Sequence, residues 1–107
     1  MKLTKLQVYA VSSLLKNLEN LVRRNEATVQ NLSVLYNNET PNMVYVKYEK
    51  ATPSADMYAL EGKIVRIDSQ GNGELINDKF EDVFAQSAFL SMCKPINMNK
   101  ISEYIVD

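Results

Sequence analysis

The sequence predicts an α+β fold with a long N-terminal amphipathic helix, a small three-stranded antiparallel sheet, and one or two C-terminal helices. Apolar residues recur at helical spacing from Leu3 to Leu32, β-branched and aromatic residues gather over residues 43–76, and a second set of apolar anchors begins at Phe80. The 107 residues, of which 46% are hydrophobic, suffice for a single α+β domain over residues 1–107 with an ordinary core.

The first expected element is one long helix over residues 1–36, because the apolar residues fall on one face at about 100° per residue. No glycine or proline precedes Pro41, so nothing obliges the helix to break early. Thirty helical residues would span about 45 Å, more than the rest of a small domain comfortably covers. We therefore expect part of this helix to project for oligomerisation.

The first strand is expected over residues 43–49, which are rich in valine and tyrosine. Its side chains should alternate between two faces, one with Val44, Val46 and Tyr48 and the other with Met43, Tyr45 and Lys47. A loop over residues 51–56 should follow, because Pro53 cannot donate to a strand ladder.

The chain beyond this loop should add two strands and the C-terminal helices. A second strand over residues 57–67, bent at Gly62, leads through a glycine-containing turn to a short return strand over residues 74–76. A helix over residues 79–93 would be capped by Asn77 or Asp78. Pro95 should stop it, and a last short helix is expected over residues 99–105.

Residues 68–80 partly resemble an EF-hand calcium loop, with Asp68 in the first ligand place and Gly73 at the sharp turn. Two positions depart from that pattern. Gln70 stands in the third ligand place, and Lys79 stands where calcium needs a bidentate carboxylate. A cation there would repel the ion, so we interpret the segment as a hairpin turn and expect no metal site.

The composition argues against an enzyme. The chain has no histidine, so Ser-His and Cys-His catalysis and the usual zinc sites each lack an essential member. Cys93 is the only cysteine and is best interpreted as a small core residue. The three glycines form no phosphate-binding or dinucleotide-binding motif. We expect no catalytic residues and no cofactor.

The same features indicate a cytoplasmic protein without a membrane segment. A single cysteine cannot close an intramolecular disulfide, and no stretch approaches the roughly 18 apolar residues that a membrane span needs. Two early lysines are not followed by the apolar run of a signal peptide.

The long helix carries the main functional hypothesis, which is a small accessory or inhibitory protein acting through a protein–protein surface. Leu14 and Leu21 share one position of a heptad seam, and Leu18 and Asn25 share the other. An asparagine at such a seam can fix register or partner number. We therefore expect a homo-oligomer and a protein partner, a style of chain common among accessory and phage-encoded proteins.

The alternative hypothesis is a nucleic-acid-binding accessory protein. Residues 1–25 hold five basic residues against one acidic residue, a charge of +4 in a chain whose net charge is −1. The exposed helix face would contact phosphates, and the first strand would supply a stacking surface. The residues expected to carry this role are Lys5, Lys16, Arg23, Tyr45 and Lys47.

Overall fold

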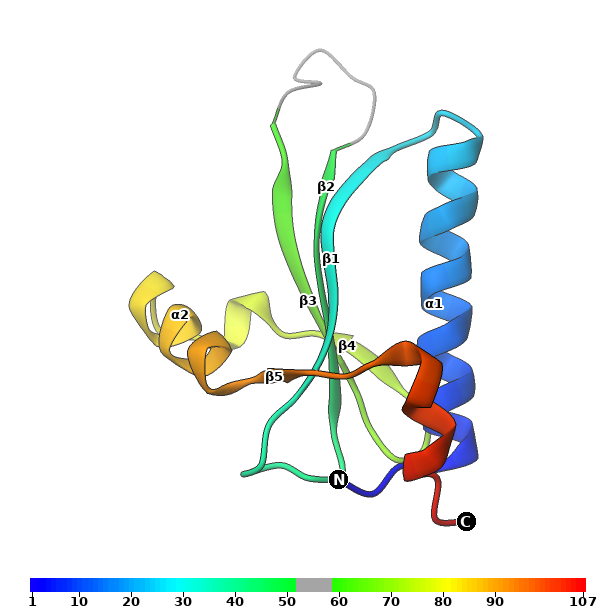
Figure 1. Cartoon of the computed structure of the whole chain (residues 1–107). Coiled ribbons are helices and arrows are strands. Elements are labelled where there is room, and N and C mark those ends of the chain that lie inside the picture. Colours follow the sequence, from blue (N-terminus) through cyan, green and yellow to red (C-terminus); the bar gives the residue numbers. More distant parts are fainter. Residues whose placement is uncertain (52–58) are drawn as a thin grey trace.

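The computed structural model describes residues 1–51 and 59–107. Its centre is an antiparallel five-stranded sheet in the order β4-β3-β2-β1-β5. The strands are β1 (Thr28–Tyr36), β2 (Val44–Ala51), β3 (Glu61–Ile67), β4 (Gly73–Leu75) and β5 (Lys94–Pro95). The helices are α1 (Lys5–Arg23) and α2 (Val83–Met92), with the 3-10 helices η1 (Asn77–Lys79) and η2 (Met98–Tyr104). Figure 1 shows α1 and α2 on opposite sides of the sheet. The α+β class and the N-terminal helix are confirmed, but the expected three-stranded sheet is wrong.

The start of α1 is fixed by a capping box that also ties the helix to the sheet. The Thr4 hydroxyl accepts from the backbone amide of Gln7, and the Gln7 side chain accepts from the amide of Thr4. The Gln7 amide group then donates to the carbonyl oxygens of Asn42 at 2.7 Å and Ile67 at 2.9 Å. A polar residue on the apolar face is thus fully buried without an unmet hydrogen bond.

The helix ends at Arg23, so the prediction of one helix over residues 1–36 is wrong. Asn25 has a left-handed φ of 58°, and its amide donates to Val22 while the amide of Glu26 donates to Leu21. This pair of bonds is the Schellman motif, in which a left-handed residue turns the chain away from the helix axis. Asparagine tolerates that conformation better than most residues. The remaining 19-residue helix is about 28 Å long.

The segment expected to continue the helix instead forms β1, which contains a β-bulge. Between the pairs Gln30–Glu49 and Ser33–Lys47 the register shifts by one, so two residues of β1 oppose Tyr48. Asn31, with φ of 56°, occupies the bulge and donates to Glu49 at 2.7 Å. Without the extra residue, Val29 and Val34 would point to opposite faces; with it, both pack against the α1 side of the sheet.

Each face of the sheet has its own core. The alternation of faces predicted for residues 43–49, which lie mostly in β2, is confirmed. Val44, Val46 and Tyr48 pack with α1, whereas Tyr45 lies in the second cluster, against α2. The α1 side is the larger core and also takes Ile101 of η2. The sheet is therefore a central layer with helices on both faces.

The hairpin between β3 and β4 confirms the predicted turn and short return strand. Asp68 accepts from the amides of Gln70 and Asn72, both at 2.9 Å. After β4 ends, the Asn77 side chain continues the ladder on β3, donating to Gly62 and accepting from Ile64. The expected helix cap at Asn77 or Asp78 is therefore wrong.

The C-terminal elements differ in detail from the prediction. Asp82 caps α2 by accepting from the amide of Ala85, and the helix begins four residues later than expected. The expected stop over residues 94 and 95 forms strand β5 beside β1. The last expected helix is confirmed as η2, capped by Asn97. The loop predicted over residues 51–56 is wrong at Ala51, which is the last residue of β2. The rest of that loop, residues 52–56, and the start of the second strand at residues 57 and 58 lie outside the described residues.

Candidate protein-binding surfaces

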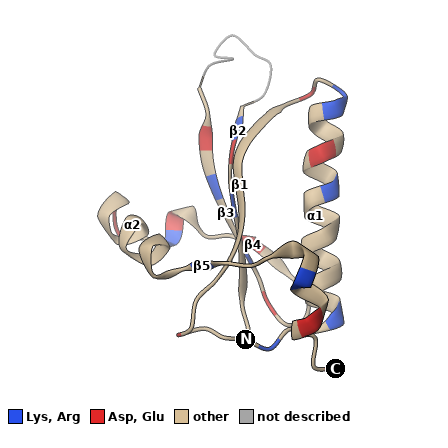
Figure 2. Cartoon of the chain, in the orientation of Figure 1, with Lys and Arg blue, Asp and Glu red and all other residues tan. Residues whose placement is uncertain are grey.

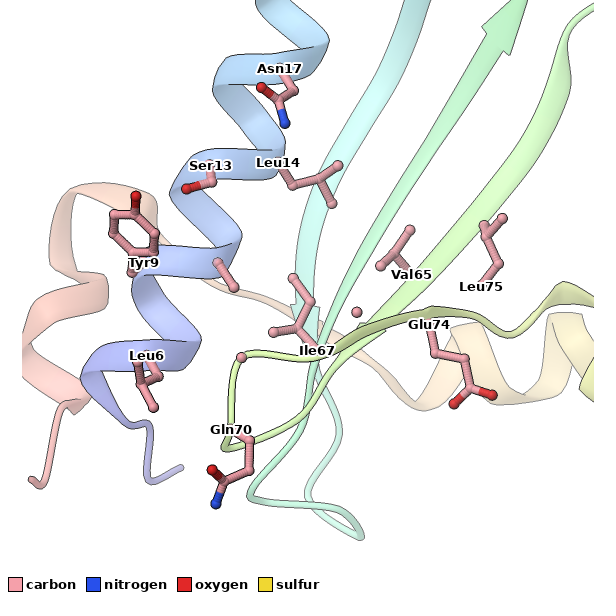
Figure 3. A pocket seen from close by; sticks show the side chains of 13 residues that line it. Leu6, Tyr9, Ser13, Leu14, Asn17, Val65, Ile67, Gln70, Glu74 and Leu75 are labelled. Atoms are coloured by element: carbon pink, nitrogen blue, oxygen red, sulfur yellow. The ribbon is translucent and has the colours of Figure 1, made fainter.

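An apolar groove of about 610 Å³ lies between α1 and the β3–β4 hairpin. Figure 3 shows Leu14 of α1 on the side of Val65 and Leu75, and the Tyr9 ring turned away from the strands. Leu6 and Tyr9 also line the groove. Tyr9 is 73% exposed, Leu6 57% and Leu75 54%. Large apolar side chains that stand this far into solvent on both walls of one groove are typical of a binding surface.

Strand β4 lines this groove and is an edge strand of the sheet, because no further strand pairs with it among the described residues. The amide of Ile76 donates to Ile64, and β4 pairs Glu74 with Arg66. Because antiparallel ladders alternate, the backbone groups of Glu74 point toward β3 and those of Gly73 and Leu75 point outward. The groove therefore contains an open strand edge.

The turn at residues 68–73 is held tightly against the first turn of α1. Gly71 has a left-handed φ of 84°, and a Cβ there would come within 3.0 Å of the Leu6 carbonyl oxygen. The Thr4 hydroxyl donates to the carbonyl of Ser69. Hydrogen bonds from the turn amides, first that of Asn72, lower the pKa of Asp68. The turn is thus fixed in place, and the groove is preformed.

The groove is nearly uncharged. The helix residues that line it, from Leu6 to Asn17, are apolar, hydroxyl or amide residues. Figure 2 shows the charged residues of α1 near its start and in its second half. Among the described residues that line the groove, Glu74 is the only acidic one. Its carboxylate contacts Lys79 at 3.0 Å and Arg66 at 2.7 Å, and these two partners lower its pKa. A bound segment would meet little net charge.

A second groove, of about 720 Å³, lies on the other side of α1, beside β1. Val22 and Leu32 are partly exposed there, and Arg23 and Glu19 stand at its rim. The bulge at Asn31 interrupts the regular spacing of outward backbone groups along β1. Bulges of this kind protect strand edges from pairing with other chains. This groove is therefore the weaker candidate for strand pairing.

The outward side of α2 is a separate apolar surface on the other face of the sheet. Phe84 is 80% exposed and Val83 is 71% exposed. No residue of α2 is buried, and none of its residues is charged. An apolar helix without a charged face is normally covered, so this surface also indicates a protein contact.

The predicted interface on α1 is for the most part the core of the same chain. Leu18 is 4% exposed, and Leu14 and Leu21 pack against the same cluster. Asn25 lies outside the helix, in the left-handed cap. The physical reason is the early end of α1, because a shorter helix fits on the sheet and leaves no overhanging seam. Leu14 also lines the first groove.

The structure separates the residues expected to bind nucleic acid. Lys5, Lys16 and Arg23 are exposed, and their spacing in α1 puts them on one line of the helix. Tyr45 is 3% exposed, with the Phe89 ring against it at 4.9 Å, so no face of its ring is open to a base. Lys47 is half-buried on the same face of β2, away from α1. The basic residues of α1 and these two strand residues therefore do not share one surface.

The only cysteine is half-buried and protonated at neutral pH. The Cys93 thiol donates to the carbonyl of Phe89, and burial raises its pKa. Over residues 1–51 and 59–107, no group of three or more acidic or cysteine side chains is placed to hold a metal ion. Asp68, in the calcium-like segment, uses its carboxylate to fix the turn.

The groove beside α1 and the exposed side of α2 were not predicted from the sequence, although the α2 segment has an unusual composition. The run from Val83 to Cys93 contains no charged residue, and that is unusual for a helix with one solvent face. The groove left no comparable signal, because its walls come from two segments, residues 6–17 and residues 65–75, that are far apart in the sequence.

The comparisons with known proteins identify no relative. No family model matches the chain, and no curated protein or solved structure is significantly similar to it. In the part of the chain that the structure describes, none of the helices combines the length and apolar character needed to cross a membrane.

Proposed function

We propose that this protein is a small, non-enzymatic protein-binding protein that takes up an extended segment of a partner in the groove between α1 and β4. One observation carries the proposal: an open strand edge lies beside a preformed apolar groove. Strand addition to a free sheet edge is a recurrent way to bind an extended peptide.

Backbone geometry supports an extended occupant. The outward groups of Gly73 and Leu75 are spaced to pair with alternate residues of another strand. Side chains of that strand would point alternately into the groove and toward solvent. Hydrogen bonds to the edge would supply affinity, and the groove would select the side chains that enter it.

Charge and polarity support a neutral, apolar segment. The helix wall of the groove carries no charged residue from Leu6 to Asn17, and Glu74 is already paired with two bases. A charged side chain entering between Leu14 and Val65 would be desolvated without a partner. We therefore expect ligands with apolar residues at every second position.

The test uses peptides selected from a random displayed library on the wild-type chain. We expect the selected peptides to alternate apolar residues. In NMR hydrogen exchange, the outward amides of Gly73 and Leu75 should exchange fast in the free protein and slow down when a peptide is added. The amide of Glu74, which points toward β3, should be protected in both states. Unchanged exchange at Gly73 and Leu75 with a bound peptide would overturn the proposal.

Two matched variants locate the binding site. Leu75→Glu places a charge at the mouth of the groove and should weaken peptide binding at least about tenfold, while the fold survives because Leu75 is exposed. Leu32→Glu alters a leucine of similar exposure, 45% against 54% for Leu75, in the other groove and should leave binding unchanged. Equal losses in the two variants would assign the peptide to neither groove.

A further inference from the structure

Helix α2 presents an apolar surface that the fold itself does not use. Its inner side holds the helix in place: Phe89 contacts the rings of Tyr45 and Phe80, with centroid distances of 4.9 and 5.3 Å, and Leu90 packs against the same cluster. Phe84 lies on the opposite side of the helix and is 80% exposed. None of the residues that the structure describes covers this outward side.

The outward side combines large and small residues. Its exposed members are Val83, Phe84, Ser87, Ala88, Ser91 and Met92. The large residues stand near the two ends of the helix, and the small ones lie between them. Small residues allow another helix backbone to approach closely. The surface is thus shaped for a helix of similar length.

The charges that flank α2 indicate which helix would pack on this outward surface. Glu81 and Asp82 precede it and Lys94 follows it, and all three are exposed. None of them is in an ion pair within the described residues. An antiparallel copy of the same helix would bring the acidic end of one chain beside the basic end of the other. Antiparallel pairing also aligns the helix dipoles favourably.

We propose that α2 binds α2 of a second copy of this chain, antiparallel and related by a two-fold axis near Ser87 and Ala88. In this register, Phe84 lies opposite the partner's Ser91, and the acidic end of each helix, preceded by Glu81, lies near the partner's Lys94. A two-fold interface uses the same patch on both subunits and is the commonest form of homo-oligomer. This contact is independent of the peptide groove, which lies on the other face of the sheet.

The size of the surface predicts a weak dimer. Ten helical residues span about 15 Å, whereas a standard stable interface buries about 800 Å² on each partner. The helix surface alone is smaller than this, and the flanking ion pairs are exposed and add little. We therefore expect a dissociation constant in the micromolar range and a dependence of assembly on protein concentration.

Sedimentation equilibrium tests the contact in the full chain. Wild type should be a monomer at low micromolar concentration and a dimer at high micromolar concentration. Phe84→Glu should weaken the dimer at least about tenfold, because the contact would bury an unpaired charge. Tyr9→Glu is the matched control, since Tyr9 is a similarly exposed aromatic residue in the groove, and it should dimerise as wild type does. Circular dichroism should show all of these variants folded.

Charge exchange tests the register. Glu81→Lys and Lys94→Glu should each weaken the dimer, and the double variant should recover most of the loss, since the pair is restored with its signs reversed. A wild-type chain that remains monomeric at high micromolar concentration would overturn the proposal. So would a dimer that survives Phe84→Glu. A double variant weaker than both single variants would exclude the antiparallel register. None of these results bears on the peptide groove, because peptide binding is measured separately and does not involve Phe84.

Discussion

Replacing Gln7 with leucine should destabilise the domain more than any other single change on the polar residues of α1. The side chain is 0% exposed and donates to two carbonyl oxygens, those of Ile67 and Asn42. Leucine has a similar volume, so packing is largely kept and the lost hydrogen bonds dominate. The Ile67 bond is fully buried, whereas the Asn42 bond is partly accessible to water.

The magnitude follows from these two environments. A buried carbonyl left without a donor costs about 1–3 kcal/mol, and a partly accessible one costs about 1 kcal/mol. The expected loss for Gln7→Leu is therefore about 2–4 kcal/mol in the free energy of unfolding. A domain of this size is typically stable by about 5–15 kcal/mol, so the variant should still fold. At about 4–8 °C for each kcal/mol, its melting temperature should fall by about 8–32 °C.

Urea and thermal unfolding measure this loss, with Gln70→Leu as the control. Gln70 is an exposed glutamine in the β3–β4 turn, and its replacement should change stability by less than about 0.5 kcal/mol. A second variant, Gln7→Glu, tests the direction in which stability changes with pH. Burial beside two carbonyls would raise the folded-state pKa of the new acid, so the stability lost relative to wild type should be smallest below about pH 4 and should grow as the pH rises through that pKa. A loss below about 1 kcal/mol for Gln7→Leu would refute this account of how α1 is attached.

Four further predictions test the end of α1, its core face, the carboxylate of Asp68 and the exposed basic residues of α1. Asn25→Gly should be neutral and Asn25→Ala should cost about 1 kcal/mol in thermal unfolding, because only glycine adopts the left-handed cap freely; stabilisation by alanine would mean that the helix continues. Leu18→Glu should unfold the domain, as circular dichroism would show, and a folded monomer would instead support the expected helix interface. Asp68 has a lowered pKa, so its contribution to the free energy of unfolding is present above the ordinary carboxyl pKa and is lost as the pH falls through the folded-state pKa. Asp68→Asn should make the free energy of unfolding, measured by urea titration, depend less on pH in this acid range. For the nucleic-acid alternative, reversing Lys16 and Arg23 should weaken oligonucleotide binding and reduce its salt dependence, and full retention of affinity would exclude that face.

The sequence contains residues that indicate the end of α1, although the helical spacing of its apolar residues does not. Apolar spacing at 3.6 residues continues through Val29 and Leu32, and it predicts one helix. Asn25, which accepts left-handed geometry, and the β-branched Thr28 and Val29 point to a cap followed by a strand. Periodicity misleads here because the bulge at Asn31 adds one residue to a period of two.

The candidate surfaces were harder to predict than the fold. For α2, an uncharged run is visible in the sequence, but whether such a helix is covered depends on how far the sheet extends beneath it. The groove needs Leu6 and Leu75, which come together only because Gly71 lets the β3–β4 turn approach the first turn of α1. No local pattern encodes that distance.

The sequence by itself determined the α+β class, the alternating faces of β2, the glycine turn after β3 and the line of bases on α1, because each depends on local spacing or turn chemistry. The tertiary structure alone decided which apolar residues remain exposed. The same leucine spacing yields core at Leu18 and a groove wall at Leu6. Burial depends on the area that distant strands cover, and that area is set by the packing of the whole chain rather than by neighbours in sequence.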